Sequence, residues 1–365
     1  MLIICPTIDY EIFLGKNFLS ADEVLFTPTD KLLKLWKDYN INGTFFPDIC
    51  SVWQHKKYGI NNYVKVFESQ MKQAVIEGHD IQLHLHPEWL SSYFSNGYWH
   101  FKEKTSSLND LEFNNNIGDS APSLISRAKQ YLEDLICSTQ NEYKCFIFRA
   151  GGWLIQPGIN IIPSLLEYNI NVDSSVIPGF LSPRIDYTID FRSTPNKTSW
   201  FVNPKKDITD EADDKNEFLE ITIGSYQGYF NMFEHIINQI RLRKRAKNFV
   251  EKKRGYPITK SIIINENYVN LIVKKYKKLI NPRVFDASDT CESMINITQS
   301  YLDKYDCESQ DIVISMNGHS KDLYNFHLIE LERYFDIINN KYSRLVKFLS
   351  LADYVKMAFP YLIKQ

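Results

Sequence analysis

Two acidic residues, one position apart, follow the first apolar run of the chain. Asp9 and Glu11 come directly after the run that begins at Leu2. In an extended chain, alternate side chains point to the same side, so the two carboxylates would lie next to each other. Neighbouring carboxylates repel unless a cation or a proton lies between them. The pair therefore suits a cation site or a general base, although an ordinary turn with solvated carboxylates would produce the same pattern.

Two histidines have the same spacing in a later apolar run. His84 and His86 would share one face of a strand, while Leu83 and Leu85 share the other. Two neutral imidazoles on one face can bind a transition metal. Hydrogen bonds inside a polar core would use the same residues. An acidic strand end elsewhere in the chain favours the metal.

Polar residues also follow three further apolar runs. Arg149 needs a carboxylate partner, because a charge left buried without one costs about 3–5 kcal/mol. The next residues, Gly151 and Gly152, would let backbone N–H groups approach a ligand closely. A structural salt bridge is the alternative for the arginine. Asp173 and His319 follow the other two runs, where a helix cap and a loop histidine are the simpler interpretations.

The elements that must position these residues alternate between strand and helix, as in successive β-α units. Polar residues at the carboxyl ends of parallel strands are typical of barrel active sites. We predict one α/β barrel over residues 1–365, with insertions at 88–118, a long loop, and at 229–282. The expected strands are 2–9, 43–47, 80–86, 145–150, 170–173, 218–223, 283–286 and 311–316, and the expected helices are 29–39, 63–77, 120–138, 292–305 and 324–340. A final strand and a short helix are expected to close the chain from 346–351.

Composition excludes several classes of protein. With 44% hydrophobic and 24% charged residues in 365, the chain can bury a substantial core. A net charge of -2 gives no general attraction to nucleic acid. The six cysteines have no Cys-x-x-Cys spacing, which suits reduced core thiols. No apolar run approaches the roughly 18 residues of a membrane span, and no signal-peptide pattern is present, so we predict a cytoplasmic protein without a transmembrane segment.

In this order, the polar segments resemble the five motifs of the polysaccharide deacetylase family, also called the NodB-homology or carbohydrate esterase family 4 group. The resemblance extends from residue 2 to about 320 and is closer to members encoded for bacterial surface-polysaccharide assembly. It implies a distorted (β/α)7 barrel. The matching segments are 7–11, 78–84, 148–153, 172–175 and 317–321.

Two departures from the family's pattern affect the expected metal ligands. The common first motif has adjacent aspartates, whereas here a tyrosine separates an aspartate from a glutamate. The common second motif is His-x-x-x-His, and from His84 that spacing reaches Glu88. We therefore take His86 as the second histidine ligand and keep Glu88 as an alternative oxygen ligand.

The resemblance implies that Glu11, His84 and His86 hold one divalent metal ion. Zinc is the default for one carboxylate and two imidazoles, and Fe, Co, Ni or Mn also suit this set. An ion there would polarise the acyl oxygen of the substrate and acidify a water molecule.

The resemblance also implies roles for the other residues. Asp9 would be the general base, with Arg149 keeping it ionised and oriented. His319 would protonate the leaving amine, and Asp173 would steer groups nearby. Backbone N–H groups of the glycine pair would help to bind the oxyanion. Water is the expected nucleophile, since no Ser-His-Asp or Cys-His order is evident.

The predicted reaction is removal of an N-acyl (acetyl) group from a sugar or sugar precursor in bacterial surface-polysaccharide biosynthesis. In the cytoplasm, nucleotide- or lipid-linked sugars would be the substrates. The basic cluster at 241–254 could hold a diphosphate or an anionic membrane surface, or be a solvated helix face. Aromatic residues of the long loop, Trp89, Tyr93, Tyr98 and Trp99, could stack on sugar rings or pack a lid.

Two other functions fit the same residues. One is a non-catalytic, metal-containing protein on the same fold that binds a glycan or a partner enzyme. The other is an amidohydrolase that acts on a non-sugar amide. A closed metal shell including Glu88 would favour the first, and a narrow apolar pocket beneath the rim would favour the second. The oligomeric state is not predicted.

Overall fold

The computed structural model describes residues 1–14, 19–101, 105–113, 117–183, 188–212, 218–226, 237 and 281–363. Most of the predicted insertion at 229–282 lies outside the described residues, and so does the whole basic cluster at 241–254. The predictions for these two segments therefore stay predictions.

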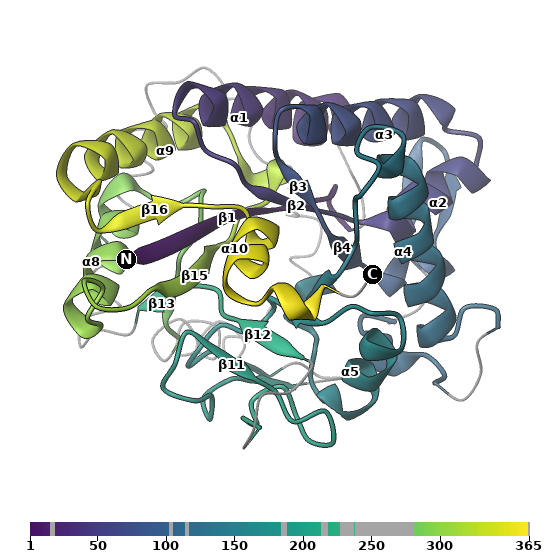
Figure 1. The fold of residues 1–365 in the computed structure, drawn as a ribbon. Coiled ribbons are helices and arrows are strands. Elements are labelled where there is room, and N and C mark those ends of the chain that lie inside the picture. The colour runs from purple at the N-terminus through teal and green to yellow at the C-terminus, as the bar shows by residue number, and fades with distance from the viewer. Residues whose placement is uncertain are drawn as a thin grey trace, which may run out of the picture.

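Two five-stranded sheets form the centre of the molecule (Figure 1). The first has the order β15-β1-β2-β3, with β16 beside β1, and all its pairings are parallel. The second has the order β11-β12-β8-β7-β4 and is parallel except for β11. The first sheet contains β1 (Leu2–Tyr10), β2 (Thr44–Pro47), β3 (Asp80–Ile81), β15 (Ile312–Met316) and β16 (Val346–Phe348). The second contains β4 (Leu83–Leu85), β7 (Ile147–Ala150), β8 (Val172–Asp173), β11 (Ser199–Phe201) and β12 (Leu219–Ile221).

Hydrogen bonds join the two sheets at both edges of the parallel part of the second sheet, beside β4 and beyond β12. On one side, the backbone N–H of Gln82 donates to the carbonyl of Phe45 at 2.8 Å. On the other side, the N–H of Ser315 donates to the carbonyl of Thr222 at 2.9 Å. The fold is therefore α/β with parallel strands, as predicted, and its strands continue across both seams.

The predicted strand at 80–86 is divided into β3 and β4 at Gln82. The side-chain oxygen of Gln82 accepts the backbone N–H groups of Phe146 and Ile147, at 3.0 and 2.9 Å. A side chain thus replaces regular ladder bonds at this position, which explains the break. The alternation of side chains still places His84 and His86 together beyond it.

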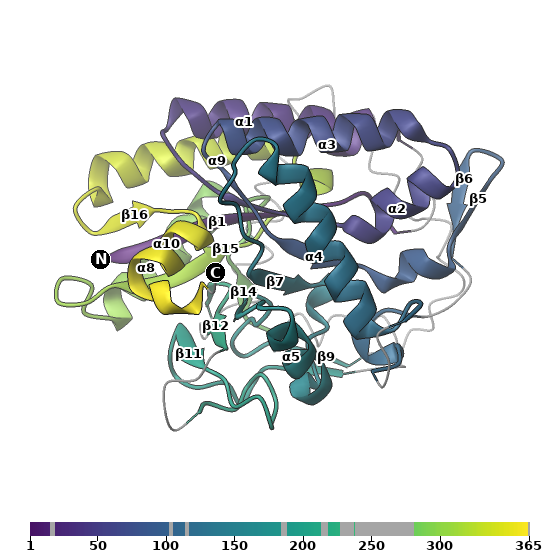
Figure 2. The ribbon, with the colours of Figure 1, turned by 45° about the vertical axis from the view of Figure 1, so that its right-hand side comes forward.

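Helices cover the outside of the sheets (Figures 1 and 2). In both views α1, α3 and α9 run side by side over one flank, while α4 and α5 cover another. On α1, Leu32, Leu33 and Trp36 are buried, because their helical spacing puts them on one face. The helices are α1 (Thr27–Asp38), α2 (Ile49–Lys57), α3 (Asn61–Ile76), α4 (Ala121–Cys137), α5 (Gly158–Glu167), α8 (Cys291–Lys304), α9 (Asn325–Ile337) and α10 (Leu351–Ala358).

Two of these helices were not predicted. The helix α2 has only nine residues, and its start depends on Asp48, whose side chain accepts the N–H of Cys50. The helix α5 contains Pro163, which disguises its helical pattern. Both lie directly after strands that carry site residues, so they help to position those strand ends.

The long loop at 88–118 is less irregular than predicted. It contains the hairpin β5 (Tyr93–Ser95) and β6 (Tyr98–His100), which stands beyond the carboxyl end of β1 (Figure 2). Asn96 and Gly97 turn the hairpin with φ values of 51° and 79°, the conformation that Asn-Gly favours. The prediction of a structureless loop is wrong here, because this turn signal was overlooked.

Smaller elements complete the described chain. The strands β9 (Leu181–Pro183) and β10 (Thr188–Asp190) pair with each other. The pair β13 (Ser225–Tyr226) and β14 (Arg283–Val284) flanks the undescribed insertion. All six cysteines are free thiols. Within the described residues, no helix has the length and apolar character needed to cross a membrane.

Candidate metal centre

The three predicted metal ligands lie together at the carboxyl ends of β1 and β4. Glu11 Oε2 is 2.6 Å from His86 Nε2 and 3.5 Å from His84 Nε2. The three ligand atoms lie within 4.8 Å of one another. The side chains are buried, with 3%, 0% and 4% of Glu11, His84 and His86 exposed. Segments more than 70 positions apart in the sequence thus supply one cluster.

Acceptor atoms in this cluster lack hydrogen-bond partners among the described residues. Glu11 Oε2, His84 Nε2 and His86 Nε2 are all buried, and their short contacts are with one another. His84 Nδ1 lies 2.8 Å from the carbonyl oxygen of Arg149, so it carries the proton and leaves the lone pair of Nε2 free. A buried polar atom without a partner costs about 1–3 kcal/mol. Because three such atoms converge, the site fits a cation.

At Glu11 and His86, burial and the neighbouring charges shift the pKa in opposite directions. Burial by itself would raise the pKa of Glu11, but His86 and Lys321 hold it well below its usual range. Burial would lower the pKa of His86, but Glu11 and Glu88 raise it well above its usual range. A proton and a metal ion therefore compete for the same imidazole.

Glu88 contacts the opposite side of the His86 ring from the cluster. Its Oε2 lies 3.2 Å from Nδ1 of His86, whereas Nε2 is the atom that faces Glu11. A carboxylate on the far nitrogen fixes the orientation of a metal-binding imidazole. This contact favours Glu88 as a residue that orients His86 over the alternative of a fourth ligand.

Asp9 lies beside the cluster and pairs with Arg149. The fully buried Arg149 guanidinium donates to Asp9 Oδ1 at 2.9 Å, to Thr7 Oγ1 at 2.7 Å and to the carbonyl of Ser174 at 2.8 Å. Burial would raise the pKa of Asp9, but the charge of Arg149, aided by His84 and His319, lowers it. Asp9 is thus a buried carboxylate held ionised, as a general base must be.

His319 is the most exposed member of the group, with 20% of its side chain accessible. Its Nε2 lies 3.4 Å from Asp9 Oδ2 and 3.8 Å from Glu11 Oε1. Its Nδ1 lies 3.7 Å from Asp322. The loop is held in place because the N–H of Asp9 donates to the carbonyl of Gly318 at 2.8 Å. His319 therefore lies between the carboxylates and solvent.

Asp173 is fully buried at the carboxyl end of β8. Its carboxylate accepts the N–H and the hydroxyl of Ser175, at 2.8 and 2.9 Å, and β12 places Glu220 beside it. Burial raises the pKa of both carboxyls, and Asp173 raises that of Glu220 further. Among the described contacts, none joins Asp173 to His319. Asp173 thus supports the floor of the site, since Ser175 in turn binds the N–H of Ala150 at 2.9 Å.

The glycine pair serves the cluster in a way that the sequence did not indicate. A Cβ on Gly151 would lie 2.5 Å from the carbonyl oxygen of Leu85 and 2.8 Å from His86 Nδ1. Gly152 and Trp153 have φ values of 57° and 61°, so the chain turns sharply here. The missing side chain at 151 lets this turn pack directly against a proposed ligand.

Two further residues of the site were not predicted. Asp48 is fully buried, and its Oδ1 accepts the N–H groups of His86 and Cys50, each at 3.2 Å. Its Oδ2 has no described partner, and burial raises its pKa to about 6. Asp48 directly follows the predicted strand 43–47. The preference of barrel active sites for polar residues at the carboxyl ends of strands could therefore have indicated it. Lys321 lies inside the fifth motif, where only His319 was given a role.

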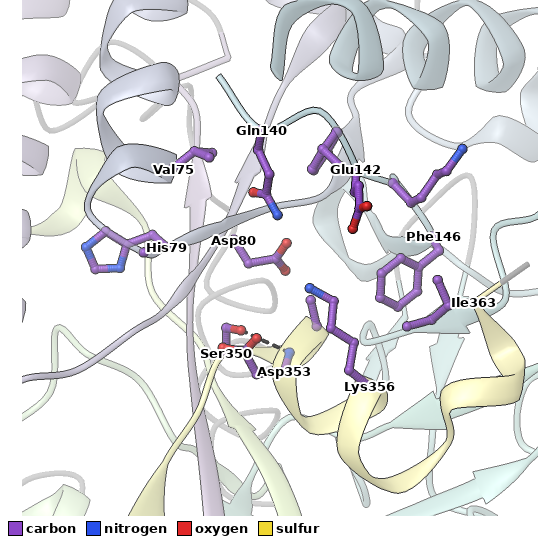
Figure 3. Close-up of a pocket in the computed structure, with 14 residues that line it drawn as sticks. Val75, His79, Asp80, Gln140, Glu142, Phe146, Ser350, Asp353, Lys356 and Ile363 are labelled. Atoms are coloured by element: carbon purple, nitrogen blue, oxygen red, sulfur yellow. Dashed lines mark hydrogen bonds between the residues drawn. The ribbon is translucent and has the colours of Figure 1, made fainter. Parts of the chain in front are cut away.

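A second cavity lies at the opposite, amino ends of the strands (Figure 3). It has a volume of about 190 Å³ and is lined by the loops before β3 and β7 and by α10. Asp80 accepts from Gln82 Nε2 at 2.9 Å and from Thr44 Oγ1 at 3.2 Å. Burial raises the pKa of Asp80 to about 7. Lys356 lies across the cavity, and no described ion pair joins it to Asp80.

Comparisons with known proteins show the following. Neither a protein-family model nor a curated protein sequence matches the chain. Among solved structures, a protein described as a polysaccharide deacetylase from Mycobacterium smegmatis is 10% identical, with a TM-score of 0.46 over 100% of this chain and 92% of that chain. A second protein described in this way, from Pseudomonas aeruginosa PAO1, is 11% identical, with a TM-score of 0.45 over 98% and 92%. The Puue allantoinase is 11% identical, with a TM-score of 0.45 over 99% and 92%.

These identities and TM-scores are too low to transfer the chemistry of those proteins to this chain. The functional conclusion must therefore come from the side chains themselves.

Proposed function

We propose that this chain is a metal-dependent hydrolase that removes an N-acyl group, such as acetyl, from a sugar or sugar precursor. The observation that carries the proposal is the convergence of Glu11, His84 and His86, with unpartnered ligand atoms, beside an Asp9 that Arg149 keeps ionised. A metal and a general base side by side are what hydrolysis by water requires.

The proposal includes a closed barrel as the scaffold. Hydrogen bonds at the seams between the sheets support it, because they give the strand order β1-β2-β4-β7-β8-β12-β15 and back to β1. In such a barrel the carboxyl ends of all strands face one rim. Asp9, Asp48, His84, Arg149 and Asp173 each end or follow one of these strands.

Each residue then has a defined part. Glu11, His84 and His86 would hold the ion, with zinc as the default and Fe, Co, Ni or Mn as alternatives. When bound, the ion would polarise the acyl carbonyl and make water more acidic. Asp9 takes the proton from the attacking water, and Arg149 keeps Asp9 charged until then. His319 lies near the surface and delivers a proton to the leaving amine.

A cavity near the carboxyl end of β1 supports a sugar as the substrate. It has a volume of about 470 Å³ and is lined by Ile12, the residue after Glu11 in the sequence, and by the β5–β6 hairpin, but by none of the proposed metal ligands. Polar side chains such as Asp22 and Asn62 line it together with aromatic rings. Sugar hydroxyls and ring faces match this mixture.

Of the four loop aromatics, Tyr98 is best placed to meet a sugar ring, since 40% of it is exposed. Trp89 and Trp99 are buried and pack on each other and on His55. Tyr93 stacks on His100. The proposal further includes surface-polysaccharide biosynthesis, nucleotide- or lipid-linked substrates and a cytoplasmic location.

The second candidate is a metal-containing protein that binds a glycan or a partner without catalysis. The position of Glu88 speaks against it. With that carboxylate on Nδ1 of His86, the ligand set Glu11, His84 and His86 leaves coordination positions for water and substrate. An open position is characteristic of catalytic rather than structural metal sites.

The proposal is tested by metal content and acetate release on purified protein. The wild type should hold about one equivalent of a divalent metal and release acetate from N-acetylated sugars. His84→Ala and His86→Ala should lose the metal. Asp9→Asn should keep the metal and lose activity by about 10²–10⁴-fold, the usual contribution of a general base. Normal metal binding by His86→Ala, or full activity of Asp9→Asn, would contradict the assignment.

A further inference from the structure

Lys321 makes direct contact with one of the proposed metal ligands. Its Nζ lies 2.5 Å from Glu11 Oε1, and only 14% of its side chain is exposed. The ammonium group also lies 5.6 Å from the centre of the Phe13 ring. A lysine so close to a cation site is unexpected, since it would repel the ion.

The position of Lys321 is set by its own backbone. It lies in the 3-10 turn Ser320–Asp322, directly after His319. The hydroxyl of Ser320 is 2.7 Å from that of Thr29, and both are buried. The turn is therefore anchored to the start of α1, and the lysine reaches Glu11 from a fixed point.

The two oxygens of Glu11 have different partners. Oε1 faces Lys321, while Oε2 faces the imidazoles of His84 and His86. A glutamate has one more rotatable bond than an aspartate, so its carboxylate needs a second contact to hold one orientation. A carboxylate can also bind a metal through both oxygens, which would use a coordination position that water or substrate needs.

We propose that Lys321 is a positioning residue that holds Glu11 Oε1, so that Glu11 binds the ion through Oε2 alone. This inference rests on the proposed metal site and adds a residue to it. The lysine lowers the affinity for the ion through charge repulsion, and in return it keeps a coordination position open. Glu11 and Lys321 then form a matched pair, in which the longer acid is compatible with an open site because the ammonium restrains it.

The test is Lys321→Met in the full chain, with cobalt(II) as the probe. Without the ammonium, Glu11 should bind cobalt through both oxygens. The visible absorption of cobalt should weaken as its coordination number rises, and the dissociation constant should fall about tenfold because the repulsion is lost. Lys321→Arg should restore the wild-type spectrum, since a guanidinium can hold the same oxygen. The values of kcat and KM would separate the effects, with kcat reduced and KM little changed.

Lys31→Met is the matched control. Its Nζ also ends on a side-chain oxygen, that of Asn325 at 2.6 Å, but on the outside of the molecule. This variant should leave the cobalt spectrum unchanged. An unchanged spectrum and affinity in Lys321→Met, or loss of cobalt from folded Lys321→Met protein, would overturn the inference. If the wild type binds cobalt and releases no acetate, the proposed function fails while the role of Lys321 can still be read from the spectra.

Discussion

Glu11, which is buried, and Asp80, which is partly buried, are carboxylates at opposite ends of the same sheet, and folding shifts their pKa values in opposite directions. Burial favours the neutral form of both. At Glu11 the charges of His86 and Lys321 outweigh burial, and the pKa falls well below its usual range. At Asp80 burial prevails, and the pKa rises to about 7. Hydrogen bonds from Gln82 and Thr44 satisfy Asp80 without making it a strong anion.

The difference shows what distinguishes a cation site from a polar cavity. Burial of an acid alone favours protonation, because the neutral carboxyl group loses less solvation than the carboxylate does. A metal needs several acceptor atoms that converge and that nothing else satisfies. The carboxyl ends of the strands provide such atoms at Glu11, His84 and His86. The amino end, with Asp80 and Lys356 across a cavity, does not provide a comparable group among the described residues.

The largest expected effect is the dependence of metal affinity on pH. Since the pKa of His86 is raised well above 6.5, a metal must displace a proton from this ring near neutral pH. The apparent affinity should therefore fall as the pH falls from 8 to 6, by up to about tenfold for each unit of pH. The stability of the metal-free protein should depend on pH in the opposite direction from the metal affinity. The pair with Glu11 stabilises the fold below 6.5, and this stabilisation is lost as the pH rises through the raised pKa.

Zinc titrations at several pH values measure the effect on affinity. Asp80→Asn is the control and should leave the slope unchanged, because Asp80 lies at the other end of the sheet. An affinity that does not vary between pH 6 and pH 8 would contradict the proton competition at His86.

A smaller effect is expected from Gly151→Ala. Its Cβ would lie 2.5 Å from the backbone oxygen of Leu85, so β4 or the turn must move, and His86 with it. We expect a loss of about 1–3 kcal/mol in the free energy of unfolding, the usual cost of overpacking, together with weaker zinc binding. Denaturant unfolding and zinc titration measure the two effects.

Gly152→Ala is a matched control for this variant. Its Cβ would meet nothing closer than 3.8 Å, on Leu154, and only its φ of 57° is unfavourable. It should cost about 1–2 kcal/mol for the left-handed backbone and should bind zinc normally. Equal zinc binding by both variants would show that the turn does not position His86.

The smallest effect is expected at the amino end, from Asp80→Asn. An acid whose pKa rises from 3.8 to about 7 on folding destabilises the fold progressively as the pH rises between these values. The asparagine should therefore be more stable than the wild type at pH 8, by about 1–2 kcal/mol, because the carboxyl is partly accessible and the full linkage does not apply. At pH 4 the two proteins should be nearly equal. If Asp80→Asn gained more stability over the wild type at pH 4 than at pH 8, the raised pKa of Asp80, and with it the contrast with Glu11, would be wrong.

Local patterns were enough to predict much of the fold and part of the site. The buried run of β1, the helical spacing on α1 and the late strand β15 were all predicted within about two residues. The helices α2 and α5 were missed, the first because it is short and the second because of Pro163. The hairpin at 93–100 was missed although its Asn-Gly turn was visible in the sequence.

By itself, the sequence determined which side chains share a face, because the period of a strand is a local property. That is why Asp9 with Glu11, and His84 with His86, could be paired before any fold was known. Only the tertiary structure decided which pairs meet. It placed Lys321 on Glu11 and Asp48 on the N–H of His86, and it placed Asp173 against Ser175. Such contacts depend on the register between distant strands and on the path of the turns, which no spacing within one segment records.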